Sequence, residues 1–254
     1  MQRPKTAKPH TELCYLCRRP NAETMDHIPS KGIFEEPRPS NLISVPCCEQ
    51  CRQGQHDDDE FFRLFVCGLF HRNEPAARLW TKKVVPSTLK RGGRIGEMID
   101  DLRRTATPIV ITRNGKPAEV TRFTVSQDAI NRVLLRITRG LYFLERPHVD
   151  SSNFVFRVEQ MDPLRGVDSS TITDLDNLFA NHLTRGNQMF DCWWELRDKK
   201  PIVTRYVHMF ARSAIWVVLF AEPPTLLNKL RTRLEGIFRI GRLPKNRRLP
   251  KVSR

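Results

Sequence analysis

The sequence predicts an α+β protein with a small metal-stapled module at its N-terminus, and three observations favour this fold class. Two Cys-x-x-Cys pairs, Cys14/Cys17 and Cys48/Cys51, lie within the first sixty residues, where there are too few apolar residues for an independent core. The dipeptide Asn114-Gly115 separates two β-branched runs, which is typical of a β-hairpin. A helical apolar period precedes several strand-like runs in the second half of the chain.

From this pattern we expect five regions. They are a flexible N-terminus over 1–12, the module over 13–72, a helical linker over 73–107, a mixed α+β domain over 108–238 and a basic disordered tail over 239–254.

The first predicted helix covers 58–72, because Asp58 and Asp59 lie where the helix dipole favours negative charge and an apolar pattern follows them. Residues 73–107 read as short helices broken at Pro75, Pro86 and Gly92-Gly93, and the clearest of them is 95–104. The hairpin is expected from Pro108 to Val125.

Ser126 is the predicted N-cap of the next helix, which carries apolar residues at 130, 133, 134 and 137 and is expected to end at Gly140. Arg132, Arg136 and Arg139 form a stripe on its other face, which either follows a phosphate backbone or is simply solvated. Further expected elements are strands at 154–158, 192–196, 202–210 and 213–220, a helix at 172–183 and an amphipathic helix after Pro224.

The net charge of the chain and the length of its apolar runs indicate what it binds and whether it contacts a membrane. Its 43 Lys and Arg against 28 Asp and Glu give a net charge of +15, so we expect a polyanion, most simply nucleic acid, as partner. The longest apolar run, 214–220, is too short to span a bilayer, and 1–10 lacks the apolar stretch of a secretory signal. We therefore expect a cytoplasmic protein with no membrane contact, and the sequence does not indicate its oligomeric state.

Five of the seven cysteines fall between 14 and 51, and such crowding in a reducing compartment favours metal ligation over disulfides. Four thiolates from Cys14, Cys17, Cys48 and Cys51 complete a closed tetrahedral Zn²⁺ site, which is structural because no coordination position stays open. Cys47 is an alternative partner for Cys51, although the x-x spacing favours Cys48. Cys67 and Cys192 lie among apolar residues and are predicted core thiols.

Between the two pairs lie Asp26-His27-Ile28-Pro29 and Asn41. This combination resembles the HNH, or ββα-metal (His-Me finger), endonucleases, and 13–63 is similar to a bacterial subgroup whose C-terminal portion resembles 139–143 here. The resemblance implies a ββα module and hydrolysis of DNA. It implies that His27 deprotonates a water, that Asp26 binds Mg²⁺ or Mn²⁺, and that Asn41 orients His27.

One residue departs from the family pattern. The family places a second metal ligand directly after the last cysteine, where this chain has Arg52, which has no lone pair to donate. His56, or else Asp57 or Asp58, is the expected substitute ligand, while Arg52 alternatively contacts phosphate. Lys31 and Arg38 are further candidate phosphate contacts.

Three hypotheses of different class follow. The first is a metal-dependent endonuclease acting on DNA, with RNA as the other substrate. The second is a zinc-stapled nucleic-acid-binding protein without catalysis, motivated by Arg52. The third is a protein-interaction adaptor in which zinc serves only as a staple.

Overall fold

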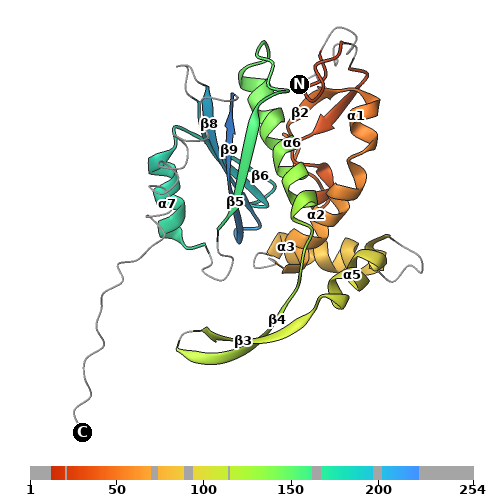
Figure 1. Ribbon diagram of the computed structural model, residues 1–254, viewed down its shortest axis with the longest axis vertical. Coiled ribbons are helices and arrows are strands. Elements are labelled where there is room, and N and C mark those ends of the chain that lie inside the picture. The colour runs from red at the N-terminus through yellow and green to blue at the C-terminus, as the bar shows by residue number, and fades with distance from the viewer. Residues whose placement is uncertain are drawn as a thin grey trace, which may run out of the picture.

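A computed structural model describes residues 13–20, 22–69, 74–88, 94–113, 115–161, 167–196 and 202–222. The chain folds into both helices and sheets, which confirms the α+β class (Figure 1). No helix among these residues is long and apolar enough to cross a membrane. The predicted flexible ends at 1–12 and 239–254 and the helix after Pro224 lie outside the described residues.

The N-terminal module is a two-stranded hairpin followed by helices. Its elements are β1 (Thr24–His27), the 3₁₀ turn η1 (Lys31–Ile33), β2 (Ser44–Cys47), α1 (Glu49–Gln53) and α2 (His56–Leu69). The strands are antiparallel, with Asp26 opposite Val45 and His27 opposite Ser44. The order β, β, α is the one that the resemblance led us to expect.

The linker region contains several short helical elements, but the chain stays helical from 74 to 88, so the break predicted at Pro86 is wrong; Gly92-Gly93 lies outside the described residues. The elements are α3 (Glu74–Leu79), the π-helical turn η2 (Trp80–Val84), α4 (Val85–Thr88) and α5 (Arg94–Arg104). Pro75 lies in the first turn of α3, where the missing proline N–H costs no hydrogen bond, whereas Pro86 directly follows the π-helical turn η2 within a continuous helical segment over 74–88.

The predicted β-hairpin is present as a ribbon that extends away from the body of the molecule (Figure 1). Its strands are β3 (Thr107–Arg113) and β4 (Lys116–Arg122). Gly115 has φ +75°, so the turn uses the left-handed conformation that glycine adopts without strain.

The C-terminal part is a five-stranded antiparallel sheet in the order β5-β9-β8-β7-β6. Its strands are β5 (Val155–Gln160), β6 (Asn181–Arg185), β7 (Phe190–Glu195), β8 (Val203–Phe210) and β9 (Ala214–Ala221). Helix α6 (Gln127–Glu145) lies between this sheet and the N-terminal module, and α7 (Ser169–Leu178) covers the other face (Figure 1).

Two predicted boundaries are wrong. Helix α6 begins at the predicted N-cap Ser126 but continues through Gly140 to Glu145. A Cβ atom at Gly140 would lie only 2.3 Å from Ile28 Cδ1, so this glycine permits close packing rather than ending the helix. The helix predicted over 172–183 ends at Leu178, because residues 181–185 pair with β7 and form the edge strand β6.

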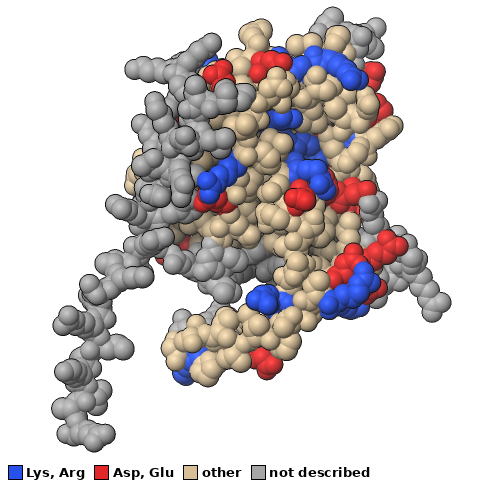
Figure 2. Space-filling model, in the orientation of Figure 1, with Lys and Arg blue, Asp and Glu red and all other residues tan. Residues whose placement is uncertain are grey.

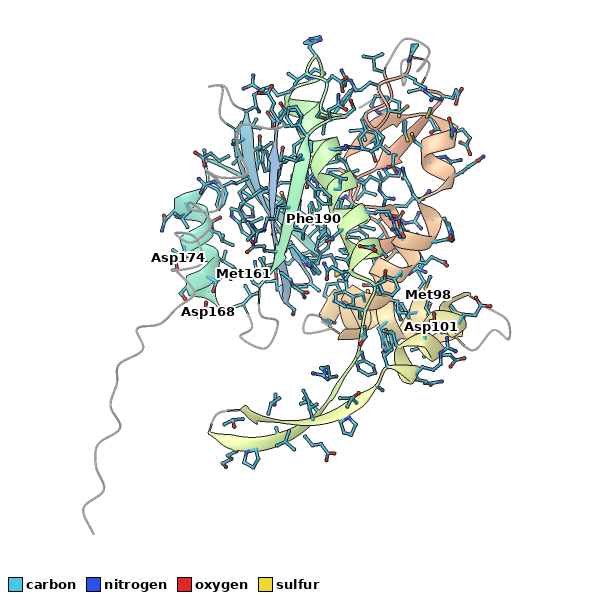
Figure 3. All side chains as sticks on the ribbon, viewed as in Figure 1. Met98, Asp101, Met161, Asp168, Asp174 and Phe190 are labelled. Atoms are coloured by element: carbon cyan, nitrogen blue, oxygen red, sulfur yellow. The ribbon has the colours of Figure 1, made fainter. Side chains whose placement is uncertain are left out.

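One hydrophobic cluster joins the module to the C-terminal sheet. Phe62 of α2 packs edge to face on Phe210 of β8, with ring centroids 4.9 Å apart. Phe190 lies in the interior on the α6 side of the sheet, whereas Asp174 of α7 lies on the other side (Figure 3). Cys67 and Cys192 are fully buried, which confirms them as core thiols. The domain boundaries stay a prediction.

Candidate functional site

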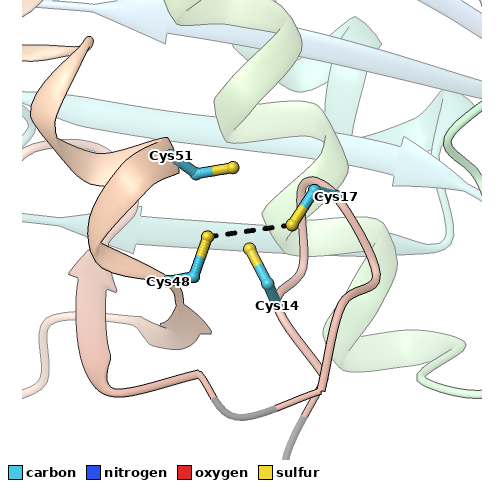
Figure 4. Close-up of side chains that lie close together, drawn as sticks. All are labelled: Cys14, Cys17, Cys48 and Cys51. Atoms are coloured by element: carbon cyan, nitrogen blue, oxygen red, sulfur yellow. Dashed lines mark hydrogen bonds between the residues drawn. The ribbon is translucent and has the colours of Figure 1, made fainter.

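The four predicted zinc ligands come together. Cys14 and Cys17 lie in a tight loop closed by a 2.9 Å hydrogen bond from the Arg18 amide to the Cys14 carbonyl. Cys48 is the N-cap of α1 and Cys51 lies in its first turn, so both thiols leave the same end of the helix. The four sulfurs lie within 4.8 Å of one another (Figure 4).

The spacing of the sulfurs fits a tetrahedral zinc ion. Cys17 Sγ and Cys48 Sγ are 3.7 Å apart. Zinc–sulfur bonds of about 2.3 Å at tetrahedral angles place neighbouring sulfurs about 3.8 Å apart. These four residues can therefore hold a structural metal ion such as zinc, which would tie the loop before β1 to the helix after β2.

Cys47 is not one of the four ligands, which agrees with the preference for Cys48. Its thiol is buried and donates a 3.5 Å hydrogen bond to the Cys48 carbonyl, and its proximity to Cys14 lowers the pKa of the Cys14 thiol to about 3. This contact favours the thiolate form of Cys14, which is the form that binds a metal.

His27 is the last residue of β1, and its ring is held by the opposite strand. Its Nδ1 atom lies 2.9 Å from Ser44 Oγ, on the residue directly across the hairpin. Partial burial lowers the pKa of His27, and the positive charges of Lys31 and Arg38 act in the same direction, while Asp26 raises it. The imidazole is therefore neutral at pH 7, which is the form that can accept a proton.

Asn41, the predicted orienting residue, lies elsewhere in the structure. It is exposed in the turn before β2 and lines a pocket of about 520 Å³. The other lining residues are 34–37, 39 and 40 of the same loop, Pro75 and Arg78 of α3, and Gly186 and Asn187 in the turn after β6. The side chain that holds His27 is Ser44, which the sequence reasoning missed. The signal available in the sequence was the hairpin register, since a residue directly across a strand pair shares the same face.

Asp26 faces a different set of groups from His27, because neighbouring residues of a strand point to opposite faces. The Tyr15 hydroxyl donates a 2.6 Å hydrogen bond to Asp26 Oδ2. Arg136 Nε of α6 lies 3.9 Å from the same oxygen. Burial raises the pKa of Tyr15 well above its usual value, and the negative charge of Asp26 adds to this effect.

The arginine stripe of α6 packs against the acids that open α2. Arg132 makes two 2.7 Å hydrogen bonds to Asp58, and Arg136 makes a short ion pair with Asp59. The Arg136 side chain is only 5% exposed. Both alternatives predicted for the arginine stripe are therefore wrong for this residue, which is neither solvated nor free to follow a phosphate backbone. On the face drawn in Figure 2, basic and acidic side chains lie next to one another in several places.

The residues predicted to bind a catalytic cation do not form a ligand cluster. Among the described residues, only the four cysteines group three or more Cys, His, Asp or Glu donor atoms. The His56 side chain is 76% exposed, with Nδ1 3.9 Å from Asp57. Arg52 is half exposed and donates hydrogen bonds of 2.9 and 3.0 Å to Glu49. The donor set around Asp26 therefore does not fit Mg²⁺ or Mn²⁺, which prefer several oxygen ligands.

No family model, no curated protein and no solved structure matches this chain. The likeness to HNH endonucleases thus rests on the cysteine pairs, the Asp-His dipeptide and the residues around them.

Proposed function

We propose that this protein is a zinc-stapled endonuclease of the HNH type that hydrolyses phosphodiester bonds in DNA, with His27 as the general base. The observation that carries the proposal is the position of His27. Its neutral imidazole stands at the end of a hairpin whose flanking segments carry the four clustered cysteines.

The chemistry required of His27 follows from its hydrogen bond. If Nδ1 carries the ring proton and donates a hydrogen bond to Ser44 Oγ, Nε2 keeps its lone pair and can take a proton from a water molecule. The hydroxide formed in this way would attack the phosphorus atom and break one of the two P–O ester bonds, and the leaving oxygen would take a proton from water to give a free hydroxyl group. Ser44 is then a positioning residue, because it holds the ring without touching the phosphate.

Basic side chains near His27 support a phosphate ligand. Lys31 and Arg38 are both exposed, and both lie close enough to lower the pKa of His27. Burial lowers the pKa of Lys83, and the neighbouring charges of Arg63 and Arg38 lower it further. Clustered cations of this kind are stabilised when they bind an anion, and phosphate is the anion that nucleic acid offers.

A second candidate function is nucleic-acid binding without cleavage. It is favoured by Arg52, which stands in the place of the usual metal ligand, and by Arg136 beside Asp26. On this alternative the zinc-stapled module binds a phosphate backbone and leaves it intact, and affinity falls steeply as the salt concentration rises.

Nicking of supercoiled plasmid by the zinc-loaded full chain separates the two candidates. We expect the wild type to nick DNA and His27→Ala to lose about 10²- to 10⁴-fold in rate, the usual contribution of a general base. Parallel reactions with Mg²⁺, with Mn²⁺ or with no added divalent cation determine whether the divalent cation implied by the family is needed, and a structured RNA replaces the plasmid in a further arm. Salt-sensitive binding with no nicking under any of these conditions would reject the enzyme and favour the second candidate.

A further inference from the structure

We propose that the guanidinium group of Arg136 is the resident cation beside Asp26, and that it keeps Mg²⁺ and Mn²⁺ from this carboxylate. The importance of this arrangement for hydrolysis rests on the proposed function. The identity of the cation beside Asp26 does not, and it can be measured separately.

One oxygen of the Asp26 carboxylate already has two partners. Its Oδ2 atom accepts the 2.6 Å hydrogen bond from Tyr15, which is itself 1% exposed. Arg136 Nε lies 3.9 Å from the same oxygen, is shielded from solvent and has no hydrogen-bond acceptor of its own. The positive charge of Arg136 therefore offsets the negative charge of Asp26 through the ion pair, although the Arg136 Nε–H group makes no hydrogen bond.

The position of Arg136 is fixed by the packing of two helices. Asp58 and Asp59 are consecutive on α2, and Arg132 and Arg136 lie one turn apart on α6. Each arginine pairs with one of these acids, so the two ion pairs hold α6 against α2. A buried guanidinium stays where its carboxylate partners are, because leaving either charge unpaired in the interior is strongly unfavourable.

Arg136 and Arg52 both disfavour a divalent cation at Asp26. Arg52 removes the donor atom expected directly after the last cysteine, and it bonds to Glu49 instead. Arg136 places a permanent positive charge beside the carboxylate that remains. A divalent cation at Asp26 would therefore have fewer than three clustered protein ligands and a repelling neighbour.

Binding of Mn²⁺ tests the proposal without reference to cleavage. Zinc-loaded full-length protein is titrated with Mn²⁺, and free Mn²⁺ is followed by electron paramagnetic resonance. We expect wild type and Asp26→Asn to bind Mn²⁺ equally weakly. Arg136→Gln should bind one Mn²⁺ at least tenfold more tightly than wild type, and the double variant Arg136→Gln/Asp26→Asn should lose this gain.

Arg132→Gln is the matched control, because it removes the neighbouring ion pair on the same two helices but leaves Arg136 in place. It should bind Mn²⁺ as the wild type does. The proposal is overturned if the wild type holds a Mn²⁺ ion that Asp26→Asn removes, a comparison that needs no change at Arg136. It is also overturned if Arg136→Gln, shown to be folded by its circular dichroism and thermal transition, gains no affinity. Absence of nicking by every variant would reject the proposed enzyme alone.

Discussion

The contact between Gly140 of α6 and Ile28 joins the helix to the residue that follows His27, and it can be tested by adding a single methyl group. In Gly140→Ala the new Cβ would lie 2.3 Å from Ile28 Cδ1 and 3.1 Å from Cγ2. Ile28 is 1% exposed and β-branched, so it cannot easily rotate away. Overpacking costs about 1–3 kcal/mol, whereas alanine gains up to about 1 kcal/mol over glycine in a helix. We expect a net destabilisation of up to about 2 kcal/mol.

A double-mutant cycle measured by urea unfolding isolates this contact. Ile28→Val removes Cδ1 and alone should cost about 0.5–1.5 kcal/mol. In the double variant the alanine methyl occupies the vacated space, so the two changes together should be at least about 1 kcal/mol less costly than their sum.

Gly54→Ala is the control for this cycle, because nothing lies within 4 Å of its added Cβ, and it should be close to neutral. The packing explanation fails if Gly140→Ala stabilises the protein and adds to Ile28→Val within about 0.5 kcal/mol.

Three further predictions concern the metal, a buried histidine and the positioning of His27. Cys48→Ser should lower the zinc content, measured by native mass spectrometry, below one ion per chain and should unfold the module, whereas Cys47→Ser should keep the zinc. Equal zinc content in the two variants would contradict the proposed set of four ligands. His208 is fully buried with its pKa lowered to about 3, so below pH 6.5 the unfolded chain binds a proton that the native state does not, and stability falls as pH falls. The free-energy advantage of wild type over His208→Gln should shrink by about 2 kcal/mol between pH 7 and pH 5, and an unchanged advantage would contradict the burial argument. Ser44→Ala should slow nicking and alter the pH profile of the nicking rate, while Ser44→Thr, which keeps the hydroxyl, should restore the rate and the profile. A pH profile identical to wild type in Ser44→Ala would exclude the positioning role of Ser44.

Local patterns predicted much of the fold. The Cys-x-x-Cys spacing predicted the metal cluster, Ser126 predicted the start of α6, and the Asn-Gly dipeptide predicted the β3–β4 hairpin. Each of these signals acts within a few residues, so a single sequence contains it. Strand β6 was missed because its short segment becomes a strand only through pairing with β7.

The surroundings of Asp26 and His27 could be predicted only in part, because they depend on contacts between distant segments. Arg136 reaches Asp26 from a position 110 residues further along the chain, and nothing in the spacing of the α6 arginines distinguishes it from Arg132. Gly140 was mistaken for the end of the helix because the Ile28 side chain that requires a glycine there lies far away in the sequence, in the loop after β1. To predict the contact between Ser44 and His27, one would have needed the register of the β1–β2 hairpin, whose connecting loop is sixteen residues long.

The most direct test of the central claim is to follow the imidazole of His27 by nuclear magnetic resonance while a short DNA duplex is added, with His27→Gln used to assign the signal. The pKa of His27 should lie below 6.5 in the free protein and rise when DNA binds, since a nearby phosphate favours the protonated ring. A signal that titrates identically with and without saturating duplex would show that His27 does not meet the phosphate backbone, and the nuclease proposal would fall with it.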